Sequence, residues 1–187
     1  NNYEDILSIA FEEGASYNLR QISLWMPKFR AIAREFIAFD HERRKGGCKI
    51  YSELYGEIKL KIAETEVVIS AIADRIEVDA NNNIYLLDYK TGTLPSKQDV
   101  INGISVQMIV ESMIANSGGF NNISGTVKEI IYVKIASSAP YISYKSYSFT
   151  SEEIEQHKAG LIKILAHYAS GGEYNVQLNK KYAAKYN

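Results

Sequence analysis

The stretch that decides the fold is Val67–Gly92, VVISAIADRIEVDANNNIYLLDYKTG. Its first part, Val67–Val78, is rich in β-branched residues, and Ile84–Lys90 forms a second short apolar run. The segment Asp79–Asn83 between them is dense in residues that favour turns. We therefore predict two strands joined by a five-residue turn, which together form a β-hairpin.

Each strand of this hairpin is expected to place every second side chain on the same face. One face would then carry Val68, Ile72, Asp74, Ile76 and Val78 from the first strand, and Ile84, Leu86, Asp88 and Lys90 from the second. The charged side chains therefore share a face with apolar rows, which is unusual for residues that merely face water.

The register of the hairpin determines which charges meet. If the turn pairs Val78 with Ile84, the same register places Asp74 directly opposite Asp88. Facing Cβ atoms in such a pair are about 4.5 to 5.5 Å apart, and like charges there are destabilising unless they are neutralised. A divalent cation would neutralise them, and Lys90 on the same side can reach a phosphate near that cation. The alternative is a surface ion pair between Asp74 and Arg75 beside an ordinary strand end.

The rest of the chain predicts helices on both sides of these strands. Gly46 and Gly47 end the second helix, and Thr150 with Glu153 forms a capping-box pattern before the last one. The pattern indicates an α/β fold with a mixed sheet covered by helices. The expected elements are helices over Tyr3–Glu13, Pro27–Arg44, Gln98–Asn116 and Ser151–Tyr168, and further strands over Ile50–Ile62, Thr126–Ile135 and Tyr141–Phe149.

Composition sets outer bounds on the kind of protein. At 187 residues and 46% hydrophobic content, the chain is most simply one domain, residues 1–187. Its apolar runs are shorter than the roughly 20 residues that cross a bilayer, so we expect a cytoplasmic protein without a membrane partner. The start at Asn1 without Met suggests a fragment of a longer polypeptide. A net charge of −1 counts modestly against nonspecific DNA binding by the isolated chain.

Four further polar residues attract attention near the hairpin. Gln107 and Glu111 are four apart on the expected helix, where they could meet each other and the hairpin's end; a helix flank facing water is the alternative. Glu53 and Glu57 share a face of the first strand and could add a ligand, although a solvated strand face explains them equally well. The histidines His41, His157 and His167 are not at the spacing of a zinc site.

The hairpin motifs and Gln107 together resemble the RecB-like branch of the PD-(D/E)XK nuclease superfamily. The resemblance extends to the C-terminal nuclease domains of AddB-type proteins from alphaproteobacteria. It implies a restriction-endonuclease-like fold and a metal-dependent DNA exonuclease in a helicase-nuclease that resects double-strand breaks for recombinational repair, with an AddA-like partner subunit. The residues that carry it are Ala73–Glu77, Leu87–Gly92 and Gln107, with Trp25–Pro27, Arg34–Phe36, Pro95–Ser96 and Gly119–Phe120 around them.

The resemblance also implies roles for individual residues. The GxxD aspartate falls on Asp74, the Asp-x-Lys motif on Asp88 and Lys90, and the glutamine of QxxxY on Gln107. Mg²⁺ or Mn²⁺ would be held by Asp74, Asp88 and the carbonyl oxygen of Tyr89. Lys90 would orient or help deprotonate the attacking water, and Gln107 would position the water or the DNA backbone.

This chain departs from the family pattern at two positions. Glu111 stands where the motif has tyrosine, and the family's upstream histidine has no match, since His41 lies in Asp40-His41-Glu42. The single Cys48 cannot hold the iron-sulfur cluster that some relatives bind through four cysteines. A nuclease-like module that binds DNA or docks a subunit without catalysis is therefore an alternative, and a standalone restriction or repair endonuclease is another.

Overall fold

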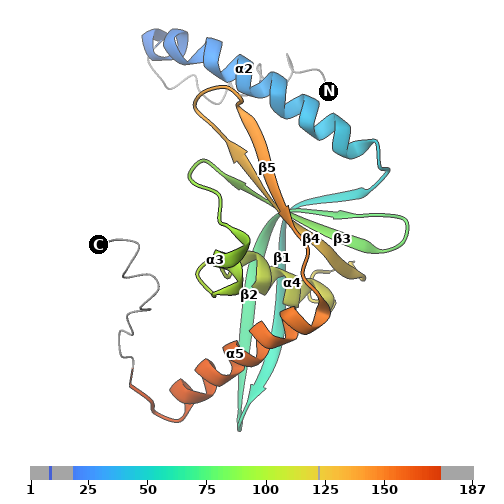
Figure 1. Ribbon diagram of the computed structural model, residues 1–187, viewed down its shortest axis with the longest axis vertical. Helices are drawn as coiled ribbons and strands as arrows, with labels where there is room; N and C mark the ends of the chain where they lie inside the picture. The colour runs from blue at the N-terminus through green and yellow to red at the C-terminus, as the bar shows by residue number, and fades with distance from the viewer. Residues whose placement is uncertain (1–8, 10–18, 122, 174–187) are drawn as a thin grey trace.

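The computed structural model describes residue 9 and residues 19–121 and 123–173, and it contains a five-stranded sheet. The strands lie in chain order, β1-β2-β3-β4-β5; β3 and β4 are parallel and the other neighbours are antiparallel. The predicted α/β class with a mixed sheet is confirmed (Figure 1). The elements are α2 (Leu19–Arg44), β1 (Lys49–Ile62), β2 (Thr65–Val78), β3 (Asn83–Lys90), α3 (Lys97–Ile101), α4 (Gln107–Asn116), β4 (Thr126–Ile135), β5 (Ile142–Tyr147) and α5 (Ser151–Ala169).

The β2–β3 hairpin has the predicted register. Val78 pairs with Ile84, and the ladder continues to Arg75 opposite Leu87. The carboxylate of Asp79 closes the turn, since its Oδ1 accepts from the backbone N–H groups of Asn81 (2.8 Å) and Asn83 (2.9 Å). Such side-chain bonds to nearby backbone are the reason that Asp and Asn favour turns.

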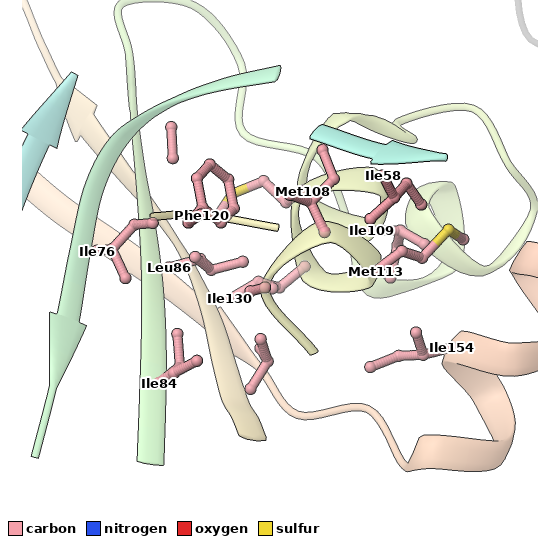
Figure 2. Close-up of a cluster of buried hydrophobic side chains, with 14 of the residues drawn as sticks. Ile58, Ile76, Ile84, Leu86, Met108, Ile109, Met113, Phe120, Ile130 and Ile154 are labelled. Carbon is pink, nitrogen blue, oxygen red and sulfur yellow. The ribbon is translucent and has the colours of Figure 1, made fainter. Parts of the chain in front are cut away.

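The main hydrophobic core lies on one face of the sheet, beneath α4 and α5. Ile76, Ile84 and Leu86 of the hairpin are fully buried there, as are Met108 and Ile114 of α4. Figure 2 shows these strand side chains facing the helices. Burial of side chains of this size contributes about 1.5 to 3 kcal/mol each, so this face fixes the position of α4 over the hairpin.

The predicted face of β2 is correct only for its second half. Val68 and Ile72 are 49% and 56% exposed, whereas Ala73 is fully buried. The β1–β2 ladder omits the pair Glu53–Asp74, and Glu53 has a φ of 50°. At this irregularity the core-facing side switches, so that alternation counted back from Asp74 assigns Val68 and Ile72 to the wrong face.

A second, smaller cluster lies on the other face of the sheet. Leu87, Ile131 and Val133 are buried there against Phe39 of α2. Consecutive residues Leu86 and Leu87 thus point into opposite clusters, as strand alternation requires. The sheet is therefore covered on both faces, by α2 on one side and by α4 and α5 on the other.

Several expected helices differ in their bounds. The helix predicted over Gln98–Asn116 is broken into α3 and α4, because Gly103 adopts a φ of 70° between them. Helix α2 begins at Leu19 and contains Pro27 in its interior rather than at its start. The capping box of α5 is confirmed, with Thr150 and Glu153 each accepting from the other's backbone N–H.

The described residues decide how two further expectations, the first helix and the absence of a membrane span, can be compared with the structure. The helix expected over Tyr3–Glu13 lies outside the described residues, apart from Ile9. Within the described part of the chain, no helix is both long and apolar enough to span a bilayer.

Candidate active site

The two predicted acids lie side by side on adjacent strands at the open end of the hairpin ladder. Asp74 follows the last pair of that ladder in the direction away from the turn, and its Oδ2 accepts from the backbone N–H of Tyr89 at 2.9 Å. Asp88, on β3, is the neighbour of Tyr89 and is 2% exposed. The predicted proximity of the acids therefore follows from the hairpin register.

Asp88 is a buried carboxylate with only one of its two oxygens engaged. Its Oδ1 lies 2.8 Å from the Nζ of Lys90, whereas its Oδ2 is buried and has no hydrogen-bond partner. Burial raises the pKa of Asp88; Lys90 opposes this through its hydrogen bond and charge, and the charge of Asp74 adds to the increase. The net increase means that the loss of hydration on burial outweighs the hydrogen bond and charge of Lys90.

A chain of side-chain contacts connects Asp88 to helix α4. The Nζ of Lys90 donates to the Oε1 of Gln107 at 3.0 Å, and the Nε2 of Gln107 donates to the Oε1 of Glu111 at 3.1 Å. Gln107 is the first residue of α4, so the break between α3 and α4 places it at the edge of the site. The structure thus connects Asp88, Lys90 and Gln107 directly, while Asp74 lies on the adjacent strand and is bonded to the backbone N–H of Tyr89.

Glu111 is buried, and the alternative of a helix flank facing water is wrong for this residue. It is 1% exposed, and its Oε2 has no hydrogen-bond partner. Burial raises its pKa to about 7; the hydrogen bond from Gln107 opposes the increase, and the charges of Asp88 and Asp74 add to it. Its place on the apolar stripe, between Met108 and Ile114, is a signal in the sequence that could have indicated burial.

The other two glutamates are not brought into this chain of contacts. Glu53 is exposed at the irregularity of β1, and the Oε2 of Glu57 accepts from the hydroxyl of Tyr55 at 2.7 Å. Sequence reasoning missed Tyr132, which is fully buried and lies beside Asp88 in the parallel β3–β4 pairing. Burial raises the pKa of Tyr132 to about 12, so its hydroxyl stays protonated beside the acids.

The donor set at the hairpin fits a hard divalent cation. Asp88 and Glu111 each have a buried oxygen without a partner, and burial, together with the charge of Asp88, raises the pKa of Glu111. In the ranges that the structure describes, no three His, Cys, Asp or Glu side chains are grouped to hold a metal. Mg²⁺ usually needs only one or two carboxylates, because it keeps several waters. Asp74, Asp88 and the carbonyl oxygen of Tyr89 would meet that requirement.

Comparisons with known proteins identify a family. The family model described as PD-(D/E)XK nuclease superfamily matches residues 4–183. Proteins described as uncharacterized, from Rickettsia bellii and Rickettsia conorii, are 40% and 37% identical, each over 87% of this chain. The chain spans only 21% and 22% of their respective lengths. The five-stranded mixed sheet is consistent with the restriction-endonuclease-like fold of that superfamily.

One solved structure also aligns with this chain. The structure titled "Crystal structure of SSO0001" covers 85% of this chain and 70% of its own, with a TM-score of 0.40 and 12% identity. A likeness at this level supports no conclusion about function.

Proposed function

Because the chain belongs to the PD-(D/E)XK nuclease superfamily, we propose that residues 1–187 form one nuclease domain that hydrolyses phosphodiester bonds in DNA with Mg²⁺ or Mn²⁺. The observation that supports this most is the buried Asp88, whose Oδ1 meets Lys90 and whose Oδ2 has no partner. A buried charge normally has partners for both oxygens, so the unpartnered oxygen of Asp88 supports a role for this carboxylate as a cation ligand.

In the proposed reaction, water attacks phosphorus and the bond from phosphorus to one flanking sugar oxygen breaks. Asp74 and Asp88 would hold the cation with the carbonyl oxygen of Tyr89; when bound, the cation stabilises the charge that develops on the phosphate. The bond from the Tyr89 N–H fixes the Asp74 carboxylate. The ammonium of Lys90 orients the attacking water and adds positive charge, and Gln107 holds that ammonium in place.

The finer assignment is a DNA exonuclease domain of an AddB-type helicase-nuclease. In this proposal the domain acts in the cytoplasm with an AddA-like subunit and resects double-strand breaks for recombinational repair. The support is the resemblance carried by Asp74, Asp88, Lys90 and Gln107 at their motif positions. Digestion of linear and covalently closed circular DNA by the full-length protein tests it: an exonuclease degrades only the linear form, and equal attack on the circle would contradict it.

A catalytically inactive module that binds DNA or docks a subunit is the second candidate. The lack of a match for the family's upstream histidine favours it, as does the net charge of −1. Calorimetric titration of the full-length protein with Mn²⁺ separates the candidates. The nuclease proposal predicts binding that is lost in Asp74→Asn and Asp88→Asn; no binding dependent on these residues would support the inactive module.

A further inference from the structure

We propose that Glu111 is a positioning residue of the site, which fixes the side-chain amide of Gln107 so that the amide oxygen faces the ammonium of Lys90. This inference rests on the proposed function, because Lys90 is the group assigned there to the attacking water. It concerns a residue that the motif resemblance leaves without a role, since the motif has tyrosine at this position.

The geometry that carries the inference is a continuous chain of four side chains. Asp88 Oδ1 lies 2.8 Å from Lys90 Nζ, Lys90 Nζ lies 3.0 Å from Gln107 Oε1, and Gln107 Nε2 lies 3.1 Å from Glu111 Oε1. Glu111 contributes the last acceptor, one helical turn from Gln107. The chain therefore begins on β3 and ends inside α4.

The chemistry of these groups admits one orientation of the amide. An ammonium only donates hydrogen bonds, a carboxyl oxygen that carries no proton only accepts them, and an amide accepts at its oxygen and donates at its nitrogen. The Oε1 of Glu111 faces Gln107 and can accept from it whether or not the other oxygen, Oε2, carries a proton. With Lys90 on one side and Glu111 on the other, Gln107 must direct its oxygen to Lys90. Gln107 is itself exposed, so water alone would satisfy either orientation. Without the acceptor at Glu111, the nitrogen of the exposed amide is no longer held, and the amide is free to turn away from Lys90 toward water.

Packing does not explain this carboxylate. Glu111 is 1% exposed, and its second oxygen has no partner. A half-satisfied buried carboxylate costs stability relative to an apolar side chain of similar shape. Methionine matches the length of glutamate and is a good helix former, so Glu111→Met is expected to fold at least as well as the wild type. Loss of function in a variant that is no less stable would place the role in the site.

The first test is a double-mutant cycle on DNA cleavage by the full-length protein with Mg²⁺. Glu111→Met is expected to lower kcat by about 10- to 100-fold with KM unchanged. Gln107→Met should lower kcat similarly, and the double variant should be no worse than either single one, because both changes remove the same contact. Additive losses would overturn the proposal.

Two further variants separate positioning from structural damage. Glu111→Gln keeps an acceptor oxygen for Gln107 and should recover most of the activity that Glu111→Met loses; equal loss would contradict the proposal. Ser112→Ala is the matched control in α4, because the Ser112 hydroxyl is also buried but donates to the Met108 carbonyl of its own helix. It should leave kcat as in the wild type, and a loss as large as that of Glu111→Met would contradict the proposal.

The second test does not depend on activity. Acetylation of Lys90 by acetic anhydride, followed by peptide mass spectrometry in the metal-free protein, measures how firmly the ammonium is held. Glu111→Met should speed this acetylation about threefold, as expected from the loss of one hydrogen bond, and Ser112→Ala should not. An unchanged rate would overturn the inference. If the wild type cleaves no DNA, the proposed function fails, yet this labelling still decides whether Glu111 positions Gln107.

Discussion

The buried carboxyl group of Glu111 makes stability depend on pH. Its pKa is raised from the ordinary 4.5 to about 7, so the folded protein keeps the proton at pH values where the unfolded chain has lost it. The stabilisation is fully present below pH 4.5 and is lost as the pH rises toward 7. We predict that the free energy of unfolding of the metal-free protein falls by about 3 kcal/mol across this window because of Glu111.

Urea unfolding in EDTA at pH 5 and at pH 7.5 measures this effect. Glu111→Gln removes the titrating group and should flatten the profile, whereas Glu155→Gln, at an exposed position of α5, should leave the profile as in the wild type. The same fall in both variants would show that other groups cause it.

At the scale of elements, an ion-pair network holds α2 against the sheet. Glu77 of β2 is 1% exposed and lies 2.6 Å from Arg43 of α2 and 2.8 Å from Arg75. Arg75 also pairs with Asp40 of α2, at 2.5 Å. Arg75 and Glu77 alternate with Asp74 and Ile76 along β2. The network therefore lies on the face of the sheet opposite the main core and packs α2 against the strands that carry the site.

Glu77→Gln should destabilise the protein by about 3 kcal/mol, because it removes the anion of the half-buried Arg43 and leaves the buried Arg75 with Asp40 alone. Glu66→Gln is the matched control, since the pair between Glu66 and Lys59 at 3.1 Å is exposed and screened by solvent, and so contributes little to stability. Chemical denaturation measures both. A Glu77 effect as small as that of Glu66 would mean that the network does not hold α2.

The connection after α4 approaches β1 closely at Gly119. Its carbonyl oxygen accepts from the N–H of Glu57 at 3.1 Å, and a Cβ at Gly119 would lie 2.2 Å from the backbone oxygen of Glu57. Gly119→Ala should therefore cost about 1 to 3 kcal/mol in thermal unfolding. Gly92→Ala, where a Cβ meets no atom within 4 Å, should cost less. Equal effects would contradict the close approach.

Local rules predicted part of these elements and long-range packing decided the rest. The hairpin register was predictable because Asp79 closes the turn through its own neighbours, and that register places Asp74 beside Asp88. The switch of the core-facing side at Glu53 was not predictable, because glutamate rarely adopts a positive φ and nothing in the local sequence indicates one at this position. The burial of Glu111 depends on where α4 packs on the sheet, which helical spacing alone does not determine.

At the scale of the whole molecule, the candidate site lies on one face of a sheet that helices cover on both sides. All of its side chains come from β2, β3 and α4, and α2 supports the same strands from the other face. The net charge of −1 provides no general attraction for DNA. Phosphate recognition must therefore come from local groups, of which Lys90 and a cation held by Asp74 and Asp88 are the proposed ones.

Digestion of end-labelled linear DNA by the full-length protein with Mg²⁺ tests the central claim most directly. The comparison is between the wild type, Asp88→Ala and Lys90→Ala, with EDTA as the metal-free control. We predict that the wild type releases labelled nucleotides only when Mg²⁺ is present, and that both variants lose at least about 100-fold of this activity. Equal cutting by all three proteins would contradict the assignment of this site.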